Sequence, residues 1–214
     1  MLKIKDMPKL ESPFVRKVND KGHYVVTPEV NLGYEWVFTE ADVQAQEKLD
    51  GTNVSIVIEN HEIKKIYNRT SYIPFFSTGK SFIVKGLLES FERGYMDSLC
   101  DGQHFGELIG EGVNGNPLKI SGNLWIPFET YCSKHLTYKS WHEYPKTFEN
   151  IENWFKKPVS EGGIFSLFAR KRGLVMKPEG IVFHRSNGDM CKLRLDMFEF
   201  YYEQNPSAKQ HGHG

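Results

Sequence analysis

Cysteine is scarce in this sequence, and no cysteine pattern suggests a cross-linked or metal-stabilised fold. The 214 residues include three cysteines, Cys100, Cys132 and Cys191, which lie far apart and form no Cys-x-x-Cys pair or Cys/His cluster. An odd number of scattered cysteines argues against a disulfide or zinc framework. We therefore expect free thiols that are buried or chemically indifferent.

Long apolar runs are also missing. No stretch approaches the roughly 20 apolar residues of a membrane-spanning helix, and the N-terminal "MLKIKDMPKLESPF" lacks the apolar core of a signal peptide. The sequence has no internal repeat and no low-complexity linker. These absences predict a cytoplasmic globular protein without a membrane partner.

An excess of positive charge is absent too. Lys and Arg total 27, as do Asp and Glu, so the formal net charge is zero. Proteins that wrap nucleic acid over a wide surface usually carry a basic excess. If this chain binds a polynucleotide, the contact must be a local basic patch. The candidate clusters are Lys64-Lys65, Lys156-Lys157 and Arg170-Lys171-Arg172.

Alternating apolar and polar residues predict two β-hairpins. Residues 54–59 and 62–68 alternate on either side of a turn at Asn60-His61, and residues 179–185 and 189–195 alternate on either side of Ser186-Asn187-Gly188. An Asn-Gly pair between alternating runs is a strong hairpin signal. Further strands are expected at 104–110 and 123–131, and helices at 80–99 and at 147–157, the latter capped by Thr147. This order predicts an α+β fold with mainly antiparallel sheets flanked by helices.

The segment "AQEKLDGTN", residues 45–53, places Lys48 two residues before Asp50-Gly51. Taken alone, it fits a solvated lysine beside a turn. Charged residues in later strands favour a functional interpretation. Glu107 in "FGELIG" and Glu179 in "EGIVF" are acidic residues beside apolar ones, where a cation or a ligand is expected.

Two cations in "CKLRL" strengthen this interpretation. Lys192 and Arg194 are separated by one residue, so on a strand both point to the same face. Arg69 in "NRT" is a further candidate cation. For any one of these charged residues, the alternative that it occupies the solvent face of a half-exposed strand stays open.

Together, these residue types suit attack by a lysine on a phosphate. A lysine nucleophile must be neutral, but an unperturbed lysine with a pKa near ~10.4 is about 0.1% neutral at physiological pH. Nearby carboxylates alone would favour the ammonium. A divalent cation on those carboxylates, with Lys and Arg beside it, would reverse the local field and suit a polyphosphate. We therefore expect Lys48 to attack the α-phosphate of a nucleotide, with pyrophosphate leaving.

Five segments resemble, in order, the signature elements of the covalent nucleotidyltransferase superfamily of ATP-dependent polynucleotide ligases and mRNA capping enzymes. They are "EKLDG", "NRT", "FGELIG", "EGIVF" and "KLR", spread over residues 46–195. The longer segments "EKLDGTN", "NRTSYIP" and "GELIGEGVNGNPLKI" are similar to the RNA-ligase branch. The resemblance implies an adenylyltransferase (nucleotidyltransferase ligase) fold with a central nucleotide cleft, in the cytoplasm of a bacterial or phage-infected cell.

The resemblance also implies a role for each matching residue. Lys48 would form the lysyl-AMP phosphoamide, Glu47 and the neighbouring backbone at Leu49 would lie near the adenine edge, and Asp50 and Gly51 would shape the turn beside the nucleotide. The remaining roles concern the sugar, base, phosphates and metal. They are Asn53 at the sealing step, Arg69 at the sugar or 5′-phosphate end, Glu107 at the ribose hydroxyls, Phe128 stacked on the base with Trp125 as the competing candidate, Glu179 at the divalent metal, and Lys192 and Arg194 at the α-phosphate and pyrophosphate.

The chain departs from the family pattern at two positions and in length. Asn68 stands where glycine is common, and Arg194 stands where lysine is usual, so phosphate contacts there would differ in geometry. We expect an irregular N-terminal segment packed on the core at 1–40, a nucleotidyltransferase domain at 41–203, a flexible tail at 204–214 and no appended OB-fold domain.

The function implied is an ATP-dependent RNA ligase that uses ATP and Mg²⁺ or Mn²⁺. Lys48 would be adenylated, AMP would pass to an RNA 5′-phosphate, and a 3′-hydroxyl would attack to release AMP. The partners would be RNA ends, and whether another protein supplies the domain expected to be absent stays open. The alternatives are a minimal DNA ligase, a GTP-dependent capping guanylyltransferase and a non-catalytic module that binds nucleic-acid ends.

Overall fold

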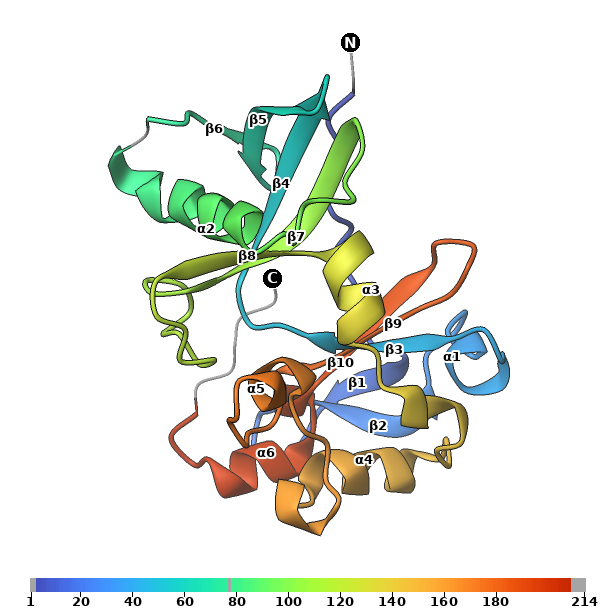
Figure 1. The fold of residues 1–214 in the computed structure, drawn as a ribbon. Coiled ribbons are helices and arrows are strands. Elements are labelled where there is room, and N and C mark those ends of the chain that lie inside the picture. The colour runs from blue at the N-terminus through green and yellow to red at the C-terminus, as the bar shows by residue number, and fades with distance from the viewer. Residues whose placement is uncertain (1–2, 77, 209–214) are drawn as a thin grey trace. The chain divides into compact units, whose positions relative to one another are not determined.

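The computed structural model describes residues 3–76 and 78–208, which form two compact units (Figure 1). Unit 1 comprises Met1–Pro8 and Leu49–Leu136, and unit 2 comprises Lys9–Lys48 and Thr137–Gly214. The domain boundaries expected at residues 40 and 203 stay predictions, and residues 209–214 of the expected tail lie outside the described residues. Among the described helices, none has the length and apolar character needed to cross a bilayer.

Unit 1 is built on an antiparallel sheet of five strands in the order β6-β5-β4-β7-β8. These strands are β4 (Thr52–Glu59), β5 (Glu62–Asn68), β6 (Ser71–Ile73), β7 (Gly102–Gly110) and β8 (Asn123–Pro127). The first predicted hairpin is confirmed, because β4 pairs with β5 around Asn60 and His61. Both turn residues have positive φ, and their N–H groups donate to the carboxylate of Asp101 at 2.7 and 3.0 Å.

Helix α2 (Ser81–Glu92) packs against β8 and β7, after a 3₁₀ turn at Thr78–Lys80 (Figure 1). Its Ile83 and Leu87 join Ile56, Leu108 and Trp125 in the buried core of the unit. The sequence pattern predicts a helix over 80–99, but the helix is shorter. Gly94 has a φ of 71°, the left-handed conformation that commonly follows the end of a helix.

The strand predicted over 123–131 is wrong beyond Pro127. Phe128–Cys132 form a π-helical turn instead, and the short helix α3 (Ser133–His135) follows. Pro127 has no N–H group to donate to a strand ladder. The backbone after it pairs locally, and the Leu136 N–H donates to the Cys132 carbonyl at 2.9 Å.

Unit 2 contains two smaller antiparallel sheets. One is the pair β1-β2, and the other has three strands in the order β10-β9-β3. The strands are β1 (Phe14–Val18), β2 (Tyr24–Val30), β3 (Gln44–Lys48), β9 (Gly180–His184) and β10 (Met190–Arg194). The helical segments are α1 (Trp36–Thr39), α4 (Phe148–Lys156), α5 (Leu167–Lys171), α6 (Glu199–Gln204) and 3₁₀ turns at Lys139–His142, Val159–Glu161 and Leu195–Met197.

The first 40 residues contain β1, β2 and α1 and are therefore not irregular as expected. The residues that suggest breaks mark the ends and irregularities of this strand pair. Pro13 directly precedes β1, and Gly22, with a φ of 81°, lies in the connection to β2. Pro28 lies in β2 where the register with β1 shifts. A Pro at such an irregularity leaves the rest of the ladder intact.

The core of unit 2 lies on one face of the three-stranded sheet. Ile181, Phe183, Cys191 and Leu193 are 0% exposed and belong to a core that also contains aromatic residues of the helical segments. The second predicted hairpin is confirmed by antiparallel pairing of β9 with β10. The predicted cap of α4 is confirmed as well, since Thr147 Oγ1 accepts the Asn150 N–H at 3.3 Å. The α+β class with antiparallel sheets and flanking helices is thus confirmed.

Candidate active site

Lys48 ends strand β3 and stands in one row with two other residues of the unit 2 sheet. Its register partner on β9 is Gly180, whose partner on β10 is Arg194. Paired residues of an antiparallel sheet lie on the same face, so the side chains of Lys48 and Arg194 lie on either side of Gly180. Gly180 has no side chain that could cover them. A Cβ atom at Gly180 would lie 2.2 Å from the Leu193 carbonyl oxygen, so the backbone allows only glycine here.

Glu179 lies next to this row, and its carboxylate contacts both cations. Lys48 Nζ donates to Glu179 Oε2 at 2.6 Å, and Arg194 Nη1 lies 3.8 Å from Glu179 Oε1. The Leu195 N–H donates to the Glu179 carbonyl at 2.9 Å, which fixes the glutamate backbone beside β10. The three side chains are 23%, 19% and 19% exposed, so the group is accessible but largely desolvated. The predicted association of Lys48, Glu179 and Arg194 is therefore present.

Lys192 lies on the same face of the sheet, two residues before Arg194. Its register partner is Val182, which pairs with Gln46 of β3. Burial lowers the pKa of Lys192, and the nearby charges of Arg194 and Lys48 lower it further. This face therefore gathers three cations near Glu179, and Arg194 also donates to Asp196 Oδ2 at 2.9 Å. An excess of cations on one face favours a polyanionic ligand.

Glu47 points to the opposite face from Lys48, as strand alternation requires. Its carboxylate is 4% exposed and accepts the Phe168 N–H at 2.8 Å and the hydroxyl of Ser166, which caps α5. Burial raises the pKa of Glu47 to about 7, although both hydrogen bonds lower it. The side chain therefore holds the start of α5, and its expected position near the adenine edge stays a prediction. The proposed backbone contact at this position stays a prediction.

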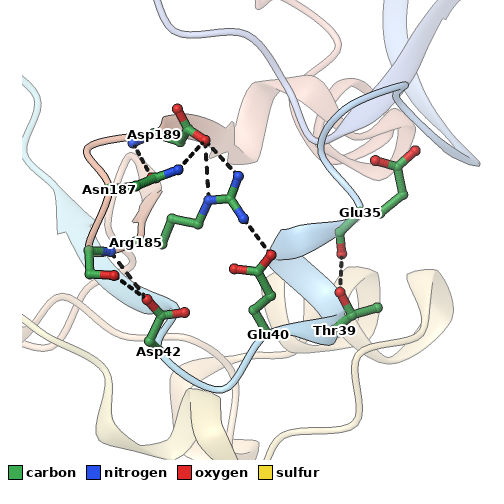
Figure 2. A network of polar contacts seen from close by, with 8 residues as sticks. Glu35, Thr39, Glu40, Asp42, Arg185, Asn187 and Asp189 are labelled. Atoms are coloured by element: carbon green, nitrogen blue, oxygen red, sulfur yellow. Dashed lines mark hydrogen bonds and ion pairs between the residues drawn. The ribbon is translucent and has the colours of Figure 1, made fainter.

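A polar network fixes the turn between β9 and β10 (Figure 2). Arg185 pairs with Glu40 and with Asp189, the latter at 2.7 Å, and its guanidinium lies 5.0 Å from the Trp36 ring centre. Ser186 donates through its hydroxyl to Asp42 at 2.7 Å. Glu40 and Asp42 lead into β3, so the network joins the chain entering β3 to the hairpin that carries Glu179, Lys192 and Arg194.

The turn after Lys48 belongs to unit 1 and is held by Asn114, which is not among the predicted site residues. Asn114 Nδ2 donates to Asp50 Oδ1 at 2.8 Å and to the Gly51 carbonyl at 2.7 Å. Asn114 has a φ of 47°, a conformation that Asn adopts more readily than most residues. A Cβ at Gly51 would lie 2.3 Å from the Leu108 carbonyl oxygen. Asn114 lies within the quoted "GELIGEGVNGNPLKI", where an Asn-Gly pair could have indicated a turn residue.

Two predicted site residues meet on the unit 1 sheet. Asn53 of β4 is the register partner of Glu107 of β7, so their side chains leave the same face. The Oδ1 atom of Asn53 is buried and has no hydrogen-bond partner among the described residues. Such a group is a common place for a ligand donor or water to bind. Leu49, in contrast, is 4% exposed and contributes to packing through its side chain.

The remaining candidates of unit 1 separate into accessible and buried residues. Arg69, with a φ of 55°, lies between β5 and β6, and its Nε donates to Asp6 at 3.2 Å. Trp125 is 0% exposed and its Nε1 donates to the Val54 carbonyl at 3.0 Å, so its ring is core. Phe128 is partly exposed and begins the π-helical turn. Of the two aromatic candidates, Phe128 is therefore the one that is partly exposed to solvent, and its stacking on a base stays a prediction.

Comparison with known proteins finds solved structures that resemble this chain, but no related sequence family. No protein-family model matches the chain, and no curated protein sequence matches it. A lysine-to-alanine variant of Naegleria gruberi RNA ligase, solved with ATP and Mn, has a TM-score of 0.52 and 17% identity over 94% of this chain and 64% of that one. An apo aspartate-to-alanine variant of the same ligase has a TM-score of 0.51 and 16% identity over 93% and 62%.

This chain thus spans slightly less than two thirds of the length of those solved structures. At such low identity the likeness concerns the fold and not the chemistry of individual residues. The chain has the nucleotidyltransferase fold of these RNA ligase structures, as the resemblance of its five signature segments predicts.

Proposed function

We propose that this protein is an ATP-dependent RNA ligase in which Lys48 accepts AMP. The observation that supports this most directly is the 2.6 Å contact between Lys48 Nζ and Glu179, with Arg194 on the other side of the same carboxylate. A structural ion pair alone would not explain three cations on one sheet face. The Naegleria ligase with the same fold was solved with ATP and Mn, which supports a nucleotide and metal ligand of this kind.

In the first step, Lys48 Nζ would attack the α-phosphorus of ATP. The N–P bond forms as the bond between the α-phosphorus and the bridging oxygen breaks, and pyrophosphate leaves with that oxygen. The ammonium must first lose a proton, and the neighbouring positive charges of Lys192 and Arg194 would favour the neutral amine. Lys192 and Arg194 would hold the phosphates, whose negative charge grows on the leaving group.

A divalent metal fits this donor set with Glu179 as its protein ligand. Among the described residues, no group of three or more His, Cys, Asp or Glu side chains forms a metal cage. Mg²⁺ commonly binds through one or two carboxylates together with water and substrate phosphates, so one glutamate suffices. When bound, the metal would supply positive charge that favours neutral Lys48 and offsets the charge of the phosphates.

In the later steps, AMP would pass from Lys48 to an RNA 5′-phosphate, and a 3′-hydroxyl would displace AMP. Asn53 and Glu107 lie together on the unit 1 sheet, where the unsatisfied Asn53 Oδ1 can accept a hydrogen bond from a ribose hydroxyl. We assign Asn53 to the sealing step and Glu107 to the ribose on this basis. Arg69 would bind the sugar or phosphate at the RNA end, and Phe128 would stack on the base.

The test is covalent labelling with α-³²P-ATP or α-³²P-GTP in the presence of Mg²⁺. We expect an acid-labile adduct from ATP that is lost in Lys48→Ala and on chelation with EDTA, and that is unchanged in Lys139→Ala, an exposed lysine of the same unit. Label from GTP alone would indicate a guanylyltransferase instead. Equal labelling of wild type and Lys48→Ala would refute the proposed nucleophile. Nicked duplexes with RNA or DNA at the 3′-hydroxyl then define the substrate.

A further inference from the structure

One stretch of unit 1 is basic and has no acidic residue. Between Glu62 and Glu89 the sequence contains no Asp or Glu, while its five basic residues are Lys64, Lys65, Arg69, Lys80 and Lys85. In a chain whose formal net charge is zero, this is a marked local excess of positive charge. Local basic excess is the electrostatic feature expected of a surface that contacts a nucleic-acid backbone.

The same stretch exposes aromatic rings. Tyr72 of β6 is 52% exposed, and Phe75 and Phe76, which follow β6, are 37% and 98% exposed. Large aromatic side chains are usually buried, because each ring removes much apolar area from water. Exposed rings among cations are the arrangement with which proteins bind single-stranded nucleic acid, because every base can stack on a ring.

The register of the sheet places Tyr72 on the same face as the proposed RNA-end residues. Tyr72 pairs with Tyr67 of β5, and Tyr67 pairs with Ser55 of β4. Ser55 lies two residues from Asn53 on the same strand, so both leave the same face. The exposed ring of Tyr72 and the pair Asn53–Glu107 therefore share one face of the unit 1 sheet.

Cations lie on that face and at its edge. Lys65 precedes Tyr67 by two residues on β5 and leaves the same face. Arg69 lies in the turn between β5 and β6, where its 62% exposed side chain pairs with Asp6. An exposed ion pair of this kind is worth little, so a phosphate can displace the aspartate. Lys65, Arg69 and Tyr72 thus belong to the β5–β6 strand pair and its turn, and the exposed Phe76 follows β6.

We propose that this edge, defined by Lys65, Arg69, Tyr72 and Phe76, binds the single strand of RNA next to the end being joined. The inference rests on the proposed ligase function and adds to it the surface that holds the strand. Tyr72 and Phe76 stack on bases, and Lys65 and Arg69 contact phosphates. Because stacking does not read base identity, binding by this edge is largely independent of sequence.

The experiment measures RNA binding and adenylation separately. Binding of a fluorescent 12-nucleotide single-stranded RNA with a 5′-phosphate is followed by anisotropy, and adenylation is measured with α-³²P-ATP without RNA. We expect Tyr72→Ala and Phe76→Ala each to weaken RNA binding roughly fivefold or more, whereas Tyr72→Phe binds like wild type. Labelling by ATP should be unchanged in all three variants.

A matched control is Phe91→Ala, which removes a 65% exposed ring of α2 that lies between Glu89 and Glu92. This variant should bind RNA like wild type. In Lys65→Gln, the slope of log K against log salt concentration should become less steep by about the amount expected for one phosphate contact. RNA binding that is equal in wild type, Tyr72→Ala and Phe76→Ala would overturn the proposal. The proposal would also be overturned if the mass measured by sedimentation fell in Tyr72→Ala and Phe76→Ala while RNA binding stayed unchanged. The two rings would then hold a second copy of the chain.

The two proposals fail in different ways. A wild-type protein that takes no label from ATP refutes the ligase function but leaves the RNA titration interpretable. A protein that is labelled by ATP and whose RNA binding ignores Tyr72 and Phe76 keeps the ligase function and loses only this surface.

Discussion

Asn114 joins the β7–β8 connection to the turn that follows Lys48, since its one amide nitrogen donates both to Asp50 Oδ1 and to the Gly51 carbonyl. The two bonds fix a carboxylate and a peptide group with a single side chain. Gly51 is also held from the other side, where β7 leaves no room for a Cβ atom. The position of this turn is therefore set by residues that follow it in the sequence by more than 50 positions.

We expect Asn114→Ala to slow adenylation of Lys48 by roughly tenfold while the protein stays folded. The loss of two hydrogen bonds is worth about 1–3 kcal/mol, part of which affects the turn that follows Lys48. The measurement is the rate of labelling by α-³²P-ATP together with the urea midpoint of unfolding. Asn116→Ala serves as a control, because Asn116 bonds within its own loop to Ile120. Equal labelling rates in both variants would contradict a positioning role for Asn114.

Replacing Gly180 by Ala should unfold unit 2 or lower its stability by several kcal/mol. The added methyl group would meet the Leu193 carbonyl oxygen and the Arg194 backbone, which belong to a paired strand and cannot move away cheaply. Thermal unfolding followed by circular dichroism measures the effect. Gly79→Ala, at a position with open space, is the matched control. A Gly180→Ala protein that melts like the control would show that the strands can separate locally.

Arg194→Lys should impair adenylation even though lysine is usual at this position in the superfamily that the five segments resemble. Arg194 Nη2 donates to Asp196 Oδ2 at 2.9 Å, and its Nη1 lies near Glu179, a geometry that uses the fork of the guanidinium. Lysine can make one of these contacts but not both. We expect a fall in labelling rate of roughly tenfold, the order of one charged hydrogen bond. A rate equal to wild type would show that charge alone is needed.

Glu47 should make stability depend on pH between about 4.5 and 7. Burial raises its pKa from 4.5 to about 7, so in this range the folded protein holds a proton that the unfolded chain has released. Stability therefore falls as the pH rises through this window, by up to about 3 kcal/mol. In Glu47→Gln this contribution is absent. The difference in melting temperature, variant minus wild type, should therefore become more positive from pH 5 to pH 8.

The control for this titration is Glu29→Gln, which changes a 61% exposed carboxylate. Its melting curve should follow that of wild type at every pH. Parallel pH profiles of wild type and Glu47→Gln would mean that Glu47 titrates alike in the folded and unfolded chains.

Local patterns predicted most of the strands because they depend on neighbouring residues. Alternation and an Asn-Gly turn were enough for the β9–β10 hairpin, and with it for the common face of Lys192 and Arg194. Thr147 was recognisable as a cap because its partner lies three residues away. The strand pair β1-β2 was missed because its prolines and glycine resemble breaks until the pairing of the strands is known.

The parts that could not be predicted depend on contacts between distant residues. Nothing near Glu47 in the sequence shows that Ser166 and the Phe168 N–H occupy its carboxylate, since these lie about 120 positions away. The bonds from Asn114 to the turn and the burial of Trp125 under α2 are of the same kind. The prediction at residues 128–131 failed for a local reason, since the apolar content of the segment resembles a strand although Pro127 ends it.

The burial of Glu47 also protects the chain against misalignment of β3. Successive residues of a strand face opposite sides, so a slip of one position against β9 would exchange Lys48 and Glu47. A carboxylate would then stand beside Lys192 and Arg194 in place of Lys48, and an ammonium group would enter the apolar core. The start of α5 disfavours that register. The Phe168 N–H donates a hydrogen bond to the carboxylate of Glu47 and could not accept one from an ammonium group. A residue on the core face of the sheet thus selects which side chain of β3 stands beside Glu179 and Arg194.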